Sequence, residues 1–399
     1  MSVTAAQGFE AGGIASGIKP SGTPDLALVA TVDHRAVTAA GVFTSNLATA
    51  APVQVSRVHL TDSMAAAVVL NSGNANAATG EHGRRDATRM CELAASGLGC
   101  LPREVLVCST GLIGIPMPMD PVEAGIPKLA GTLSADADGG TAAADAILTT
   151  DTVRKETVQH AHLGAGVTAT IGGMAKGAAM LAPSMATMLA VLTTDAAIDS
   201  GSLQAMLSSA VADSFNSLVV DGCMSTNDTV LLLANGALGN EPITAAHPAY
   251  RAFADGLDAA CADLALQMAA DAEGATKLAR VIVRGARSNA DARIAARAVA
   301  GSQLVQCSLY GNDPYWGRVL SELGASGAQF DPELTDISYQ GVVVCRDGVA
   351  AAHDTGAVAQ LMQQRDIEID CDLRAGTGTA VVHFTDLTHA YVDENMGTS

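Results

Sequence analysis

Residues 171–195 form a segment rich in small residues, methionine and threonine, and this segment holds the residue best suited to covalent chemistry. Pro183 interrupts any helix begun after Gly177, and Ala186-Thr187 then opens a new apolar run. In a tight turn, the Thr187 hydroxyl could attack the Ala186 carbonyl and convert the amide into an ester. Hydrolysis would leave Thr187 as a new N-terminus, whose α-amine is a general base beside its own hydroxyl. On composition alone, a capping or buried threonine is the commoner outcome.

Two threonine-containing turns offer further hydroxyl groups. Thr110 and Gly111 follow an apolar run, so the end of a strand could aim a hydroxyl and a backbone N–H into a cleft. Such donors stabilise the oxyanion of a tetrahedral intermediate, although the same residue types also form ordinary turns. Thr149 and Thr150 precede Asp151 and could hydrogen-bond a substrate, and a helix cap or turn is the alternative.

Side chains elsewhere in the chain could bind the charged groups of a substrate. Lys176 precedes Thr187 in the same segment, and a buried cation there could hold a carboxylate, whereas most lysines face solvent. Glu273 follows a predicted helix, and its carboxylate could bind an amino group unless it is only a solvated helix end. Asn395 lies close to the C-terminus, where chains are usually frayed.

Short apolar runs and helical patterns alternate along the chain and must position these residues. Strands are predicted over residues 26–32, 66–70, 105–108, 279–284 and 367–372, the last two with alternating apolar and charged residues. Apolar residues at helical spacing predict a helix over 257–268, and Ser288 with Asp291 resembles a capping box. Residues 132–146, rich in Gly, Ala and Asp, are either a loop or a weak helix. The pattern indicates a mixed α/β protein.

Composition excludes several classes of protein. With 399 residues, of which 49% are hydrophobic and 16% charged, the chain is expected to fold around a large core. The net charge of −19 repels phosphate backbones, so nucleic-acid binding is not expected. No apolar stretch approaches the roughly 18 residues of a membrane span, and the N-terminus lacks the pattern of a secretory signal.

Cysteine and histidine usage bears on compartment and metals. The eight cysteines form no C-x-x-C pair, so reduced thiols and a cytoplasmic location are expected. His160 and His162 lie two residues apart, but no neighbouring residue completes a metal site. Neither a metal nor a cofactor is expected.

An ordered series of motifs covers nearly the whole chain and includes the segment around Thr187. The series resembles the ornithine acetyltransferase family, also called bifunctional glutamate N-acetyltransferase, of arginine biosynthesis. The matching motifs are GIASGIKPSGTPDLALV, AAGVFTSNLATAAPV, LNSGNANAATG, CSTGLIG, TTDT, GGMAKGAAMLAPSMATMLA, SFNSLVVDG, STNDTVLLLANG, DAEGATK, GNDPYWGRVL and DLTHAYVDEN. The resemblance implies an α/β fold with mixed sheets and helices layered around the cleavage site, similar to self-processing β-aminopeptidases.

The resemblance also implies a reaction. The family cleaves itself at the position matching Ala186-Thr187, which would give an α chain, residues 1–186, and a β chain, residues 187–399, associated as an α2β2 heterotetramer. Thr187 then takes the acetyl group from N-acetylornithine and passes it to glutamate in a ping-pong reaction. Whether acetyl-CoA is a second donor stays open, as does the use of the enzyme in a specialised pathway rather than primary arginine synthesis.

Roles for individual residues follow from the same resemblance. Thr110 and Gly111 match the oxyanion hole. The substrate-binding positions fall on Thr149 rather than Thr150, and on Lys176, Thr187, Glu273, Asn395 and a terminal residue, for which Ser399 is preferred to Thr398. Residues 225–228 are expected to brace the nucleophile, with Asp228 as a weaker candidate.

The chain departs from the family pattern at several positions, and these departures keep other functions open. The residues that differ are Ala78, Ala179, Cys223, Met224, Gln306 and Tyr315. None removes a proposed catalytic group, but several lie in motifs that shape the pocket. A self-processing aminopeptidase would share the nucleophile, although Lys176 and Glu273 argue against it. A non-catalytic ligand-binding relative is the third alternative.

Overall fold

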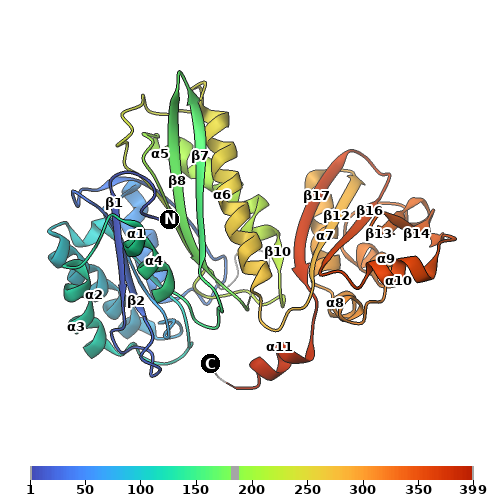
Figure 1. Ribbon diagram of the computed structural model, residues 1–399, viewed down its shortest axis with the longest axis horizontal. Helices are drawn as coiled ribbons and strands as arrows, with labels where there is room; N and C mark the ends of the chain where they lie inside the picture. Colours follow the sequence, from blue (N-terminus) through green and yellow to red (C-terminus); the bar gives the residue numbers. More distant parts are fainter. Residues whose placement is uncertain (1, 181–187, 398–399) are drawn as a thin grey trace.

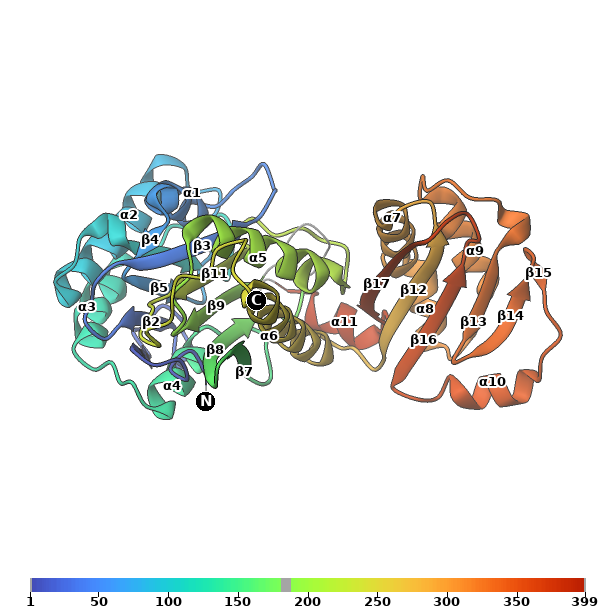
Figure 2. The same ribbon diagram turned by 90° about the horizontal axis from the view of Figure 1, so that it is seen from above.

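A computed structural model describes residues 2–180 and 188–397. Ala186, Thr187, Thr398 and Ser399 therefore lie outside the described residues. Within them, the strands form three sheets (Figures 1 and 2). This arrangement confirms the predicted mixed α/β class. No helix in the described ranges combines the length and apolar character that crossing a bilayer would require.

Two of the sheets stack face to face. The four-stranded sheet has the order β1 (Phe9–Ile14), β2 (Leu26–Thr31), β5 (Ala67–Asn71) and β6 (Val105–Ser109). The six-stranded sheet has the order β4 (Met64–Ala65), β3 (Val37–Phe43), β11 (Thr229–Ala234), β9 (Leu189–Thr194), β8 (Val167–Lys176) and β7 (Lys155–Gly164). The strands of the six-stranded sheet thus come from both sides of the 186–187 junction.

Alternating side chains along the fully buried strands explain this stacking. In β2, Ala27 and Val29 face a core shared with the six-stranded sheet, and Leu26 and Leu28 face a core shared with helices. Strand β11 is buried on both faces in the same manner. The outer side of the four-stranded sheet carries α1 (Ala51–His59), α2 (Gly80–Leu98) and α3 (Met119–Ala130), and the outer side of the six-stranded sheet carries α5 (Ser200–Asp213) and α6 (Tyr250–Ala270). Helix α4 (Ala137–Ala146) instead packs against β1 and adds its alanines to the core between the two sheets.

The third sheet forms a separate unit with its own core (Figure 2). Its order is β10 (Leu218–Val219), β17 (Gly378–Thr385), β12 (Leu278–Ala286), β16 (Asp366–Asp372), β13 (Asp336–Tyr339), β14 (Val342–Arg346) and β15 (Val349–Ala350). The helices of this part of the chain are α7 (Asn289–Ala300), α8 (Gln303–Tyr310), α9 (Trp316–Ala325) and α10 (Thr355–Leu361). The last helix, α11 (His389–Glu394), leads from this unit back toward the stacked sheets (Figure 1).

Most local predictions are confirmed. All five predicted strands are present as β2, β5, β6, β12 and β16, and the predicted helix lies within α6. The Ser288 hydroxyl accepts the backbone N–H of Asp291 and caps α7. The stretch 132–146 resolves in favour of a helix, because the Asp136 side chain accepts the N–H of Gly139 and starts α4. All eight cysteines are free.

Candidate functional site

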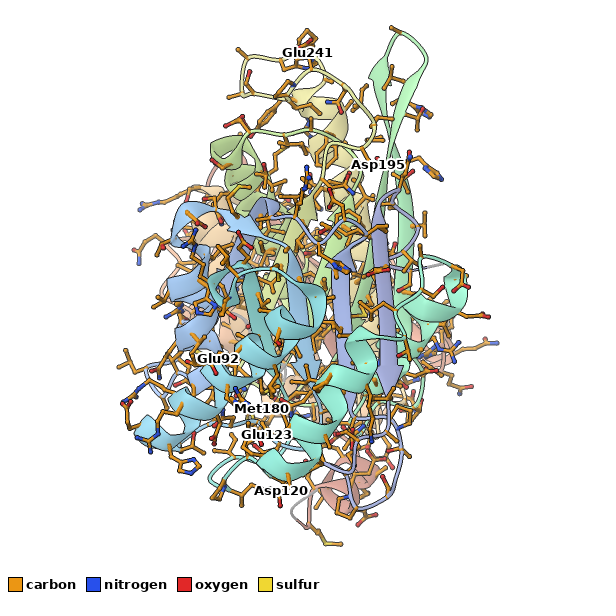
Figure 3. The ribbon with its side chains drawn as sticks, turned by 90° about the vertical axis from the view of Figure 1, so that its left-hand side faces the viewer. Glu92, Asp120, Glu123, Met180, Asp195 and Glu241 are labelled. Carbon is orange, nitrogen blue, oxygen red and sulfur yellow. The ribbon has the colours of Figure 1, made fainter. Side chains whose placement is uncertain are left out.

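A cavity of about 480 Å³ gathers the predicted residues that the structure describes. Its lining comprises Thr110, Gly111, Leu112, Ile113, Thr149, Thr150, Lys176, Ala179, Met180, Asp221, Cys223, Glu273, Tyr391, Asn395 and Gly397. These residues lie at the ends of β6 and β8, after β10 and α6, and around α11. A larger groove of about 890 Å³ between α1 and α2 contains none of the predicted site residues. Figure 3 shows Met180, at the cavity, well separated from Asp195 along the stacked sheets.

Thr110 and Gly111 begin the loop after β6. The Thr110 N–H donates to the Asn71 carbonyl at 3.0 Å, which fixes the start of this loop against the end of β5. Gly111 has a φ of +131°, and a Cβ there would lie 2.3 Å from the carbonyl carbon of Gly73. Only glycine fits this close approach. The Thr110 side chain is 1% exposed and its hydroxyl has no hydrogen-bond partner among the described residues, so it can donate to a reacting group.

Lys176, the last residue of β8, is buried rather than solvated. Its side chain is 3% exposed and its ammonium donates to Thr149 Oγ1 at 2.7 Å. The same ammonium lies 3.5 Å from Asp151 Oδ2. Asp151 closes the predicted Thr149-Thr150-Asp151 turn by accepting the N–H of Thr149 at 3.1 Å. Burial raises the pKa of the Asp151 carboxyl, but the Lys176 and Lys155 ammonium groups outweigh burial and hold that pKa well below its usual value.

Glu273 and Asn395 form another part of the cavity lining. Asn395 Nδ2 donates to Glu273 Oε2 at 2.8 Å, so the residue after α11 contacts the loop that follows α6. The approach of the two segments requires Gly274, since a Cβ there would lie 2.3 Å from the Tyr391 backbone nitrogen. The Thr388 hydroxyl donates to the Gly274 carbonyl at 2.7 Å and anchors the start of α11. The C-terminal segment is therefore ordered against the cavity as far as the structure describes it.

Asp221 joins three segments at the rim. Its carboxylate accepts the Met180 N–H at 2.5 Å, the Cys223 N–H at 2.9 Å and the Tyr391 hydroxyl at 3.2 Å. Burial, and then the negative charge of Asp221, raise the pKa of Tyr391, so this phenol stays protonated and donates. Among the described residues, the cavity lining thus contains one cation, Lys176, and the carboxylates of Glu273 and Asp221. This arrangement complements a small zwitterion such as an amino acid.

The region just after the 186–187 junction is fixed by Asp228. Its Oδ1 accepts the Met188 N–H at 3.0 Å, and its buried Oδ2 has no partner within the described ranges. Burial raises the pKa of Asp228 well above its ordinary value, and the Met188 N–H and nearby Lys176 offset only part of that shift. Ala186 and Thr187 themselves lie outside the described residues, as does Ser399.

Some site residues were missed from the sequence, and the departures fall into two groups. The sequence assigns no role to Asp151, which follows two threonines, or to Asp221 and Tyr391, which lie inside longer motifs. Ala179 and Cys223 line the cavity, whereas Gln306 donates to the Val220 carbonyl at 2.7 Å outside it. The other departures, Ala78, Met224 and Tyr315, do not line the cavity.

No group of three or more His, Cys, Asp or Glu side chains in residues 2–180 and 188–397 could hold a metal.

A family model and curated relatives match nearly the whole chain. The ArgJ family model matches residues 10–397. The arginine biosynthesis bifunctional protein ArgJ of Symbiobacterium thermophilum is 48% identical over 395 residues, covering 98% of this chain and 97% of that protein. The protein of the same name from Streptomyces coelicolor is 47% identical over 402 residues and covers 100% of both chains. A crystal structure of arginine biosynthesis bifunctional protein argJ from Bacillus halodurans is 38% identical with a TM-score of 0.50, and covers 51% of this chain and 97% of that chain.

Proposed function

Because this chain belongs to the ArgJ family, we propose that it carries an acetyl group from N-acetylornithine to glutamate on the hydroxyl of Thr187. Membership of the family confirms the predicted enzyme class, a glutamate N-acetyltransferase/ornithine acetyltransferase of arginine biosynthesis. The single observation that supports the finer proposal is the cavity, which is lined by Lys176, Glu273 and Thr110, whose hydroxyl has no partner in the part of the chain that the structure describes.

Self-cleavage between Ala186 and Thr187 is the first step of the proposal. The Thr187 oxygen attacks the Ala186 carbonyl carbon, the C–N bond breaks, and the nitrogen takes the hydroxyl proton to become a free amine. Water then hydrolyses the ester and releases the Ala186 carboxylate. Two observations support this step: Asp228 holds the Met188 N–H beside the junction, and the matched Bacillus halodurans chain covers only 51% of this one.

Acetyl transfer follows at the same hydroxyl. The α-amine of Thr187 takes the hydroxyl proton as the oxygen attacks the acetyl carbonyl of N-acetylornithine. The Thr110 hydroxyl and the Gly111 N–H donate to the oxyanion of the tetrahedral intermediate. Collapse breaks the C–N bond, the proton passes to the departing nitrogen, and ornithine leaves an acetyl ester on Thr187. The amino group of glutamate then attacks this ester and restores the hydroxyl.

Substrate binding in the proposal uses the charges of the cavity. Lys176 pairs with a substrate carboxylate, Thr149 donates or accepts a hydrogen bond beside it, and Glu273 binds an amino group. Asn395 fixes the Glu273 carboxylate, and Ser399 is proposed to complete the closure. The chemistry uses only protein groups, so we propose that the enzyme needs no cofactor. We also propose that it acts in the cytoplasm. Acetyl-CoA is a co-substrate to be tested.

The α and β chains are proposed to stay associated, as an α2β2 heterotetramer. The six-stranded sheet supports the association within one αβ unit. Its strands β9 and β11 come after the junction, and they lie between β8 and β3, which come before it. Size-exclusion chromatography with light scattering of the purified protein would measure the assembly state.

Intact-mass measurement of purified protein tests the proposal. We expect two masses that sum to the chain plus one water, and an added acetyl group on the β chain after incubation with N-acetylornithine. Thr187→Ala should stay uncut and unacetylated. An uncut wild-type chain would contradict the proposal. Cleavage without acetylation, together with release of amines from β-peptides, would support an aminopeptidase instead, and ligand binding with neither activity would support a non-catalytic relative.

A further inference from the structure

Lys155, the first residue of β7, is a fully buried lysine outside the cavity. Its side chain is 0% exposed, and its ammonium donates to Asp151 Oδ1 at 2.6 Å and to Asp271 Oδ2 at 2.5 Å. Lysine is almost never fully buried unless it is paired, because a charge loses its hydration on burial. A buried cation between two carboxylates therefore needs a reason beyond filling space.

The first carboxylate, Asp151, holds one wall of the cavity. It accepts the N–H groups of Thr149 at 3.1 Å and of Gly177 at 2.7 Å, and lies 3.5 Å from the Lys176 ammonium. Two of these three partners are the proposed ligands of the substrate carboxylate. Without Lys155, Asp151 would compete more strongly for Lys176 and draw its ammonium away from Thr149.

The second carboxylate, Asp271, supports the segment that carries Glu273. It lies at the C-terminal end of α6, where the helix dipole disfavours a negative charge. It also accepts the N–H and the hydroxyl of Thr152, so it links α6 to the same loop that carries Thr149. Two residues later Glu273 faces the cavity, with its N–H donating to the Ala178 carbonyl at 2.9 Å.

We propose that Lys155 is a positioning residue that ties the Lys176–Thr149 wall of the cavity to the Glu273 wall and sets the distance between the two. The charges alternate as Lys176, Asp151, Lys155 and Asp271, and together they are neutral, so the cation of the cavity is held without excess charge. This inference rests on the proposed function, because it assumes that the two walls bind opposite ends of one amino acid.

The experiment removes one positive and one negative charge together. The double variant Lys155→Met/Asp271→Asn keeps side-chain size and net charge, which reduces the penalty of leaving an unpaired buried ion. The matched control is Arg154→Met/Asp145→Asn, which removes the neighbouring exposed pair, held at 2.8 Å, away from the cavity. Circular dichroism and thermal melts establish that each variant is folded, and gels establish that each is cut.

In the Lys155 double variant, KM for N-acetylornithine and for glutamate should rise roughly tenfold, because small displacements of binding groups weaken recognition. The turnover number should fall less than about threefold, because Thr110, Gly111 and Thr187 are untouched. Calorimetric titration with ornithine should show the same loss of affinity, whereas the control variant should match wild type. A folded variant with wild-type KM and affinity would overturn the inference.

A second variant covers the case in which the double variant does not fold. Asp271→Asn alone keeps the Lys155–Asp151 pair and weakens only the link to α6, from an ion pair to a neutral hydrogen bond. It should weaken ornithine binding several-fold. Wild-type affinity in this variant would equally overturn the inference. Absence of both transfer and ornithine binding in wild-type protein would instead overturn the proposed function, so the two failures are distinguishable.

Discussion

The carboxyl group of Asp228 accepts the backbone N–H of Met188 across 3.0 Å, one residue after the proposed site of cleavage. Its second oxygen is buried and has no partner among the described residues. A buried oxygen with unused hydrogen-bonding capacity is costly for stability, so its presence beside the proposed cleavage site favours a role at the junction. The rate of self-cleavage is the quantity that tests this role.

Asp228→Ala should slow self-cleavage by roughly tenfold or more, because loss of the acceptor frees the Met188 amide and misplaces the junction. A time course of denaturing gels after rapid purification measures the rate. Asp195→Ala is the control, since Asp195 is also buried and accepts the Thr170 N–H at 2.9 Å, but lies at the far end of β9. Equal slowing in both variants would indicate a general loss of stability rather than a role at the junction.

Asp228 should also make stability depend on pH. Burial raises its pKa, so above about pH 4 the native carboxyl keeps a proton that the unfolded chain has lost. The native state then binds more protons than the unfolded state, and the contribution of Asp228 to stability falls as pH rises toward the native pKa. Asp228→Asn lacks this titration. The difference between the free energies of unfolding of Asp228→Asn and wild type, measured in urea, should therefore shift in favour of the variant by about 1 kcal/mol or more between pH 4 and pH 7. If stability changes with pH in the same way in the variant and in wild type, this expectation is wrong.

Thr110→Val should separate activity from stability. The Thr110 hydroxyl has no partner among the described residues, so removing it breaks no internal hydrogen bond and should change stability by less than about 0.5 kcal/mol. The turnover number should fall by about 10²–10³, the usual effect of losing one oxyanion donor. In the control Thr193→Val, the lost hydroxyl donates to the Val3 carbonyl at 2.6 Å. There, about 1 kcal/mol of stability should be lost while turnover is kept.

Cys223 offers a chemical probe of the cavity. It lines the cavity and is exposed, and burial together with Asp221 raises the pKa of its thiol. The thiolate is the reactive form, so maleimide labelling of Cys223 should be faster at pH 9 than at pH 7 and should abolish activity in parallel. Ornithine should protect, and Cys223→Ser should make activity resistant although Cys307, also exposed, is still labelled. Full activity after complete labelling of Cys223 would place substrate binding elsewhere.

Local sequence patterns predicted helices and strands well, because an element that is buried on one face has apolar residues at regular spacing. In β12, Ala279, Val281 and Val283 are buried and Arg280 and Arg284 are exposed, as their alternation indicated. Capping by Ser288 was predictable for the same reason, since the hydroxyl and its partner are three residues apart.

Long-range pairing was not predictable from spacing. Nothing local distinguishes Lys155 from a surface lysine, because one of its two carboxylate partners, Asp271, lies on another element and 116 residues away. Lys176 could be identified only through the family motif, since its burial is produced by the turn at Thr149 and by the sheet around β8. The residues of the site could therefore be predicted from motifs, whereas the network of buried charges that supports them could be identified only from the three-dimensional structure.

The alternation of strands in the six-stranded sheet has a consequence for how the molecule matures. Lys176 on β8 pairs with Leu189 on β9, and β11 pairs with β3, so strands from before and after the junction are hydrogen-bonded to one another in a single sheet. Neither piece alone could complete this sheet, and each would expose unpaired strand edges prone to aggregation. Folding must then come before the proposed scission, and the uncut precursor should recover readily from denaturation. For the severed enzyme it should be slow and dependent on concentration, because two separate polypeptides would have to find each other again.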